Sequence, residues 1–302
     1  MDHALPGDFV RRTLDLHGDA GRAWLAGLPR LIAECEARWA LTVAAPYPLS
    51  YNYVAQATRA DGAPCVLKLR AVPGEPWNEL EALRHYDGHG CAAVLAADPA
   101  LGAMVIERLR PGTLLATLPD DEATAIAANV MIRLWKPAPA THHFPTVDDW
   151  MTGLSKLRAH YGGGTGPLPA VLVTRAEGLY AELRTRSDAP VVLHGDLHHD
   201  NILAAERAPW LAVDPQGVVG EPAFEAAALL RNPLAHVRNW PDLAPRTARR
   251  LDILAERTGL DRQRLAGWAL AGAVLSAWWN VEDHGRFDPT ELRLAQALAT
   301  LV

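Results

Sequence analysis

The sequence has few of the features that mark secreted or metal-scaffolded proteins. It holds only three cysteines, Cys35, Cys65 and Cys91, whose spacing matches no zinc-binding pattern. An odd number of cysteines does not build a disulfide framework, so we expect reduced, buried thiols in a cytoplasmic protein. The first eight residues contain neither a basic segment nor a continuous apolar run. They therefore do not predict a secretory signal.

Long apolar runs and an excess of basic residues are also absent. No run approaches the roughly 18 uncharged apolar residues that cross a bilayer, and glycine and polar residues interrupt the most apolar stretch, 265–281. The formal net charge is −6, whereas a basic stripe is expected in a nucleic-acid-binding protein. The composition argues against membrane and nucleic-acid partners, and it is compatible with a cationic small molecule.

Two patterns that suggest ligand sites lack the context that such sites need. The glycine-rich segment 162–166 follows no predicted strand, and no Gly-Lys-Ser/Thr ends it, so it is not a phosphate-binding loop. His142 and His143 are adjacent, but no third metal ligand with suitable spacing follows them. We expect both segments to be surface loops.

The chain instead shows a change from strand-like to helix-like patterns near residue 110. Residues 8–40 predict an amphipathic helix, with Pro29 opening its second part. Residues 41–107 contain alternating segments and turn signals that predict a β-rich region. Residues 120–187 and 242–282 predict a series of helices. This organisation predicts an α+β fold.

The most informative stretch is 191–203, with the sequence VVLHGDLHHDNIL. An apolar, β-branched run gives way to polar residues that include Asp196 and Asn201, and a second strand-like run, 210–213, is followed by Asp214. We expect the two strands to deliver these side chains to one end of a sheet. Carboxylate and amide oxygens there would suit Mg²⁺ beside a phosphate. The alternative is a polar hairpin in which Asp and Asn serve only turn chemistry.

These residues also resemble the motifs of a known family. His-Gly-Asp at 194–196 with Asn201, followed by Asp214-x-x-Gly217, is similar to the catalytic and metal-binding motifs of the aminoglycoside phosphotransferases, whose fold is like that of protein kinases. The loop is most similar to that of the streptomycin 6-phosphotransferase and hydroxyurea phosphotransferase group. The resemblance implies a two-lobed, protein-kinase-like fold that uses ATP and Mg²⁺. The implied domains are an ATP-binding lobe over 1–107, which includes a helical extension over 1–40, and a catalytic and substrate-binding lobe over 108–302, which is larger and mainly helical.

The resemblance also implies a role for each matching residue. Asp196 accepts or orients the proton of the acceptor hydroxyl, and Asn201 and Asp214 hold Mg²⁺. Lys68, braced by Glu79, contacts the α- and β-phosphates of ATP. Further nucleotide contacts are expected from a polar turn and from the backbone of the connection between the lobes: Ser50, Asn52, Glu107 and Leu109.

The chain departs from the protein-kinase pattern in its first lobe. The segment 50–53, Ser-Tyr-Asn-Tyr, stands where a glycine-rich loop is expected. Without the resemblance, the interpretation of Lys68 as a lysine that keeps an edge strand soluble is favoured over a role at ATP. Gly195 stands where many protein kinases have arginine, so we expect no phosphorylated activation loop to switch the enzyme on.

The acceptor is expected to bind among the C-terminal helices. Glu282 and Asp283 suit a guanidinium or ammonium group, and Trp279 precedes them. Glu225 stands where the family usually has aspartate. It either braces the catalytic loop, residues 194–201, or contacts the acceptor.

The implied activity is ATP-dependent O-phosphorylation of an aminoglycoside-type antibiotic by a monomeric protein. Streptomycin is the first expected acceptor, and hydroxyurea or another small hydroxylated molecule is the alternative. Two other interpretations remain open at this point. A pseudokinase-like scaffold would bind nucleotide without turnover, and a metal-dependent phosphoesterase would not need Lys68.

Overall fold

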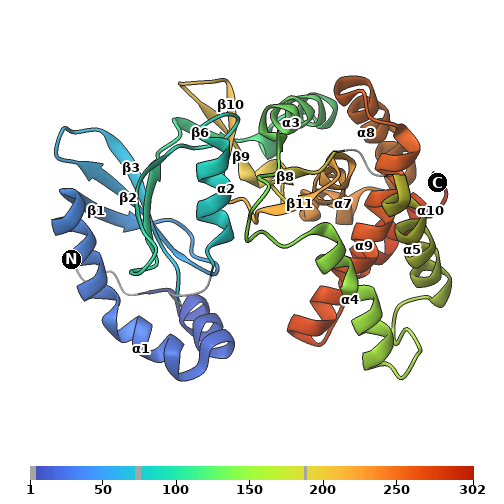
Figure 1. Cartoon of the computed structure of the whole chain (residues 1–302), viewed down its shortest axis with the longest axis horizontal. Helices are drawn as coiled ribbons and strands as arrows, with labels where there is room; N and C mark the ends of the chain where they lie inside the picture. The colour runs from blue at the N-terminus through green and yellow to red at the C-terminus, as the bar shows by residue number, and fades with distance from the viewer. Residues whose placement is uncertain (1–4, 72–75, 187–188) are drawn as a thin grey trace. The chain divides into compact units, whose positions relative to one another are not determined.

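The computed structural model describes residues 5–71, 76–186 and 189–302, so the first half of the N-terminal stretch considered above lies outside the described residues. The chain folds into two compact units, Met1–Arg110 and Pro111–Val302 (Figure 1). No helix within the described ranges is both long enough and apolar enough to cross a membrane.

The first unit is an antiparallel five-stranded sheet accompanied by helices (Figure 1). The strand order is β1-β2-β3-β5-β4. Its elements are α1 (Gly7–Trp39), β1 (Leu41–Pro46), β2 (Tyr53–Arg59), β3 (Pro64–Leu69), α2 (Asn78–Tyr86), β4 (Val94–Asp98) and β5 (Ala103–Glu107).

The alternation of side chains in β3 determines what each face of this sheet contacts. Leu67 and Leu69 are fully buried in a core cluster that includes Phe9 and Leu28 of α1. Because successive side chains of a strand point to opposite faces, Lys68 lies on the face away from this cluster. The sheet therefore separates its structural core from the face that carries the lysine.

The long N-terminal helix is interrupted at Gly18 and not at Pro29. Gly18 has non-helical backbone angles, φ 53° and ψ −126°, whereas Pro29 lies inside the helix. The expectation that Pro29 opens the second part of this region is therefore wrong. Leu28 and Cys35 are buried on either side of the proline, and this packing stabilises a helix that lacks one backbone donor.

The second unit is mainly helical and carries two three-stranded sheets, ordered β10-β9-β6 and β11-β8-β7. Its strands are β6 (Pro111–Leu114), β7 (Lys136–Pro137), β8 (Val191–Leu193), β9 (Ile202–Ala205), β10 (Trp210–Ala212) and β11 (Val218–Gly220). Its α-helices are α3 (Asp120–Leu134), α4 (Val147–His160), α5 (Ala170–Leu183), α6 (Ala226–Leu230), α7 (Leu234–Asn239), α8 (Leu243–Thr258), α9 (Arg262–His284) and α10 (Pro289–Ala299). Short 3₁₀ turns include η3 (His199–Asn201) and η4 (Pro222–Glu225).

The two apolar runs that frame the conspicuous polar stretch belong to different sheets. β8 pairs with β7 and β11, whereas β10 pairs with β9. The expectation that both runs end at one edge of a single sheet is therefore wrong. Because β9 and β10 form their own antiparallel hairpin, the second run finds its partner locally, and β8 leads alone into the polar loop.

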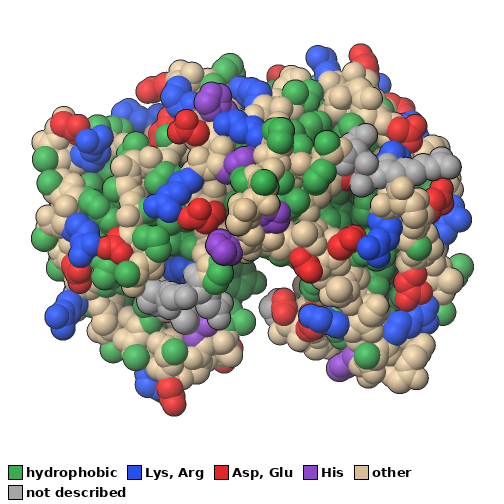
Figure 2. Space-filling model, viewed as in Figure 1, with side chains coloured by type: hydrophobic (Ala, Val, Ile, Leu, Met, Phe, Trp, Pro, Cys, Tyr) green, Lys and Arg blue, Asp and Glu red, His purple; other side chains and the backbone are tan. Residues whose placement is uncertain are grey.

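Charged side chains of both signs are interspersed over the surface. The face shown in Figure 2 carries Lys and Arg side chains among Asp and Glu side chains. Exposed pairs such as Arg184–Asp148 are typical of this surface, and each contributes only about 0–1 kcal/mol to stability. Stability therefore has to come mainly from the buried core and from buried polar contacts.

Candidate active site

The loop that follows β8 begins at a buried histidine. His194 is 0% exposed, and its Nε2 donates to the carbonyl oxygen of Val213 over 2.9 Å. Its Nδ1 accepts the backbone N–H of Asp196 over 3.3 Å. Burial lowers the pKa of His194 to about 4, so the ring is neutral and these two contacts define its tautomer. His194 thus ties the start of the loop to the end of β10, which suits a supporting role.

Glu225 holds the same part of the loop from the other side. It is 1% exposed; its Oε2 accepts the backbone N–H of His194 and its Oε1 that of Gly195, each over 2.8 Å. Burial raises the pKa of Glu225 to about 7, although the backbone hydrogen bonds act in the opposite direction. Because backbone amides occupy both carboxylate oxygens, the contacts favour bracing of the loop over contact with an acceptor.

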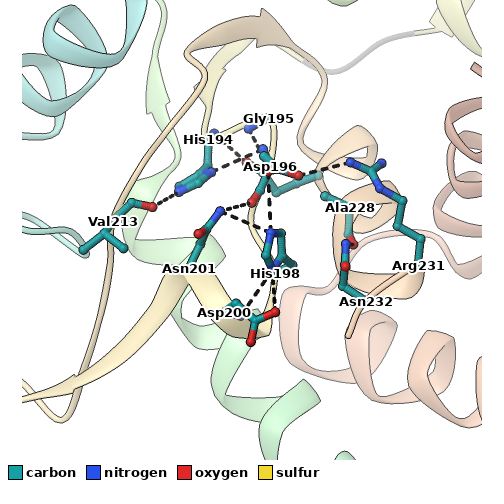
Figure 3. Close-up of polar contacts among 11 residues, drawn as sticks. His194, Gly195, Asp196, His198, Asp200, Asn201, Val213, Ala228, Arg231 and Asn232 are labelled. Atoms are coloured by element: carbon teal, nitrogen blue, oxygen red, sulfur yellow. Dashed lines mark hydrogen bonds and ion pairs between the residues drawn. The ribbon is translucent and has the colours of Figure 1, made fainter. Parts of the chain in front are cut away.

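Asp196 lies at the centre of the polar cluster drawn in Figure 3. Arg231 Nη2 donates to its Oδ1 over 3.1 Å, and His198 Nε2 lies 3.5 Å from its Oδ2. Burial acts to raise the pKa of Asp196, but the His198 contact and the Arg231 charge outweigh it and lower that pKa. The carboxylate is therefore ionised and oriented, while 30% of the side chain stays exposed to a ligand.

Asn201 and Asp214 adjoin this cluster. Asn201 Nδ2 donates to the backbone carbonyl oxygen of Asp196 over 3.0 Å, which leaves the amide Oδ1 outside that contact. Val213 N–H donates to the carbonyl oxygen of Asn201 over 2.9 Å, so the residue before Asp214 is tied to the loop. Asp214 itself is exposed and has a φ of 63°, in the left-handed region that non-glycine residues seldom adopt.

This donor set is compatible with magnesium. An amide oxygen and a carboxylate are hard oxygen ligands, and Mg²⁺ commonly needs only one or two carboxylates in addition to substrate phosphates and water. Among the described residues no group of three or more His, Cys, Asp or Glu side chains could hold a metal by itself. Asn201 and Asp214 therefore fit a cation that is held together with a nucleotide.

In the first unit, Lys68 forms the buried ion pair that was expected with Glu79. Lys68 Nζ lies 2.6 Å from Glu79 Oε1, and the two residues are 4% and 9% exposed. Trp77 Nε1 donates to the second oxygen, Oε2, over 3.4 Å. The pair joins β3 to the first turn of α2, so the lysine on the face away from α1 has a defined position.

The other expected nucleotide contacts lie in connecting segments of this unit or at the end of β5. Ser50 and Asn52 are in the connection between β1 and β2, where the Ser50 carbonyl accepts a hydrogen bond of 2.9 Å from an arginine of α1. Glu107 ends β5, and its Oε2 accepts the Ala93 N–H over 3.1 Å. Leu109 is buried. Their contacts with a nucleotide stay predictions.

The structure connects one of the expected acceptor residues with the catalytic loop. Trp279 of α9 packs edge-on against Trp150 of α4, with 5.5 Å between the ring centroids. Trp150 in turn covers Gly195, where an added Cβ would lie 2.8 Å from its Cη2. Glu282 and Asp283 are exposed in the last turn of α9, and their acceptor contacts stay predictions.

Reasoning from the sequence missed three residues of this site. His198 lies inside the loop motif, at a position that the motif leaves open. Trp150 and Arg231 lie on segments that the chain brings to the loop only by folding. No local pattern distinguishes Arg231 from the other arginines of the helical unit, so only its contact with Asp196 identifies it.

Comparisons with known proteins show the family to which this chain belongs. Residues 38–284 match the model of a family described as aminoglycoside/hydroxyurea antibiotic resistance kinase. The chain is 34% identical to streptomycin 6-kinase of Streptomyces glaucescens, covering 93% of this chain and 92% of the relative. It is also 34% identical to hydroxyurea phosphotransferase of Kitasatospora aureofaciens, covering 92% and 81%.

A solved structure shows the same fold at low sequence identity. A thermostable mutant of aminoglycoside phosphotransferase APH(4)-Ia, in a ternary complex with ADP and hygromycin B, superposes with a TM-score of 0.60 and is 14% identical. The match covers 89% of this chain and 96% of that one. The α+β, kinase-like fold expected from the sequence is thus confirmed, and membership of a kinase family implies the use of ATP. The chain belongs to the aminoglycoside/hydroxyurea antibiotic resistance kinase family, whose members are phosphotransferases that act on hydroxyl groups.

Proposed function

We propose that this protein transfers the γ-phosphoryl group of ATP to a hydroxyl group of streptomycin. One observation carries the proposal. The carboxylate of Asp196 is ionised, partly exposed and contacted at both oxygens, by Arg231 and His198. The identity with streptomycin 6-kinase over nearly the whole length of both chains supports this choice of acceptor.

Asp196 is the residue that we assign to the acceptor hydroxyl. Its carboxylate accepts the hydroxyl proton while the acceptor oxygen forms a bond to the γ-phosphorus and the bond from that phosphorus to the β-phosphate oxygen breaks, releasing ADP. A carboxylate with a lowered pKa is a weak base. Its main contribution is therefore to orient the hydroxyl for in-line attack, which suits a reaction in which positioning dominates catalysis.

Asn201 and Asp214 are the residues that would hold Mg²⁺. When bound, the ion would neutralise charge on the β- and γ-phosphate oxygens. Asn201 Nδ2 donates to the Asp196 carbonyl oxygen, and the N–H of Val213, which precedes Asp214, donates to the Asn201 carbonyl oxygen, so the backbone at both positions is tied to the loop that carries Asp196. The arrangement supports a site in which nucleotide and cation bind together.

Lys68 is the residue that we assign to the α- and β-phosphates, in an ATP-binding lobe over 1–107. Its ammonium group is buried and paired with Glu79, so its position is set before nucleotide binds. Such a pair is what a nucleotide-binding kinase needs and a phosphoesterase does not. The intact pair, together with Asp196 and Asn201, also argues against a scaffold without turnover. The remaining assignments are Ser50, Asn52, Glu107 and Leu109 for nucleotide, and Trp279, Glu282 and Asp283 for the acceptor.

The second candidate acceptor is hydroxyurea. It is supported by the identity with hydroxyurea phosphotransferase, which is as high as that with streptomycin 6-kinase. Streptomycin carries two guanidinium groups, which the exposed Glu282 and Asp283 would suit, whereas the small, neutral hydroxyurea would not need acidic partners.

A screen of acceptors tests the proposal. Purified protein is incubated with ATP and Mg²⁺, and ADP release is measured with streptomycin, other aminoglycosides, hydroxyurea or no acceptor. We expect streptomycin-dependent ADP release and a product heavier by one phosphoryl group in mass spectrometry. Release with hydroxyurea alone would favour the second acceptor. Phosphate release that needs no acceptor would favour a phosphatase, and nucleotide binding without any turnover would favour a scaffold.

A further inference from the structure

We propose that Arg231 is a positioning residue for the catalytic carboxylate, and that residues 225–232 act as a clamp that holds the catalytic loop at two points. The inference rests on the proposed function, because it takes Asp196 as the group that orients the acceptor hydroxyl. It concerns a different question, namely what keeps that carboxylate in place.

The two points of the clamp lie at the two ends of α6. At its start, Glu225 accepts the backbone N–H groups of His194 and Gly195, each over 2.8 Å. At its end, Arg231 Nη2 donates to Asp196 Oδ1 over 3.1 Å. The two ends of this short helix therefore bind the backbone that enters the loop and the side chain of Asp196. Figure 3 shows the second of these contacts, between Arg231 and Asp196.

Arg231 is itself held by the residues around it. Arg250 of α8 is 0% exposed, and its Nη1 donates to the carbonyl oxygens of Leu229 and Asn232 over 3.2 and 2.7 Å. The carboxylate of Asp120, on α3, pairs with the same guanidinium. Carbonyl groups on either side of Arg231 are thus anchored to a buried cation, so the position of its backbone is defined by the core.

The charge of Arg231 also favours the ionised form of a second carboxyl group, that of Glu291. Glu291 of α10 is 4% exposed and accepts hydrogen bonds from Ser276 Oγ over 2.6 Å and Asn280 Nδ2 over 2.9 Å. Burial raises the pKa of Glu291, and the charge of Arg231 acts against that change. Removal of the guanidinium would therefore take away a positive charge that favours the ionised form of both carboxyl groups, Asp196 and Glu291.

These contacts predict that Arg231 affects turnover more than substrate binding. Without it, Asp196 Oδ1 loses a charge-assisted hydrogen bond, and the carboxylate can rotate about its side-chain bonds. Since misplacement by about 1 Å can reduce a rate about 100-fold, we expect kcat of the Arg231→Gln enzyme to fall about 10- to 100-fold. The KM for ATP should change less than about twofold, because the change removes an interaction that acts at the transition state.

The experiment measures kcat and KM with the acceptor found in the screen, for the wild-type, Arg231→Gln and Arg231→Lys proteins. The contact with Asp196 is a single hydrogen bond and not a bidentate fork, so a lysine ammonium should restore kcat to within about tenfold of wild type. Arg262→Gln is the matched control. It removes an arginine that pairs with Asp252 over 2.6 Å elsewhere in the same unit, and kcat should stay unchanged.

Each outcome separates this inference from the proposed function. A wild-type enzyme without acceptor-dependent turnover would contradict the proposed function. An active wild type with a folded Arg231→Gln variant of unchanged kcat would overturn the role of Arg231 alone, and so would a folded Arg231→Lys enzyme as slow as Arg231→Gln. If Arg231→Gln does not fold, as judged by circular dichroism, Arg231→Lys decides. Its kcat within tenfold of wild type supports the inference, and a larger loss contradicts it.

Discussion

Gly195 is the position at which the catalytic loop should be least tolerant of change. Its φ is 80°, and a Cβ added there would lie 2.8 Å from Trp150 Cη2 and 3.0 Å from Val218 Cγ1. The N–H of Gly195 also donates a hydrogen bond to Glu225 Oε1. The substitution Gly195→Ala therefore combines an unfavourable backbone conformation with a steric overlap, next to the residue that carries the proposed chemistry.

The expected cost follows from these two contributions. A left-handed backbone costs a residue with a Cβ about 1–2 kcal/mol, and forcing an extra carbon into a packed site costs about 1–3 kcal/mol. We therefore expect Gly195→Ala to lower the free energy of unfolding by about 2–5 kcal/mol. Because the next residue is Asp196, kcat should also fall by about 100-fold.

Urea unfolding followed by far-UV circular dichroism measures the loss, and two control variants separate its parts. Gly259 has a φ of 74° but no atom within 4 Å of an added Cβ, so Gly259→Ala reports the backbone contribution alone. Gly178 lies in α5, also with nothing within 4 Å, and Gly178→Ala should stabilise the protein by about 0.5–1 kcal/mol. A Gly195→Ala loss no larger than that of Gly259→Ala would refute the reasoning about Trp150.

Two further predictions concern the buried charged and titratable groups. Lys68→Met removes the cation from the 2.6 Å ion pair with the buried Glu79. The substitution should lower the free energy of unfolding by about 3–5 kcal/mol and raise the KM for ATP, and an unchanged urea midpoint would contradict this. The pKa of His194 is lowered from 6.5 to about 4, so the unfolded chain takes up a proton over this pH range before the native protein does, and stability is lost as the pH falls. Between pH 6.5 and pH 4 the unfolding free energy of the wild type should therefore fall by about 3 kcal/mol more than that of His194→Gln, and equal pH profiles would exclude a buried neutral His194.

The parts of the site that could be predicted from the sequence are those whose residues lie close together along the chain. Asp196 and Asn201 are five positions apart in one loop, and the structure links them by a hydrogen bond. The resemblance implies the pairing of Lys68 with Glu79, and the separation of the two residues is short enough for a strand, a loop and one turn of helix to close. In both cases local geometry constrains the contact.

The features that could not be predicted depend on long-range packing. Arg231 reaches Asp196 from 35 positions away, and Trp150 reaches Gly195 from α4. Which strands share a sheet was also misjudged, because a three-residue strand such as β8 carries too little pattern to specify its partners. In these cases the contact depends on how segments far apart in the chain pack together, and the spacing of residues along the chain does not specify that.

The role of Asp196 is the central claim, and one comparison tests it most directly. Wild-type protein and Asp196→Ala are assayed for acceptor-dependent ADP release, and ATP binding to each is measured by calorimetry. We predict that turnover of Asp196→Ala is reduced by at least about 1,000-fold while its affinity for ATP stays within about threefold of wild type. An Asp196→Ala enzyme that binds ATP and retains full acceptor-dependent turnover would contradict the account.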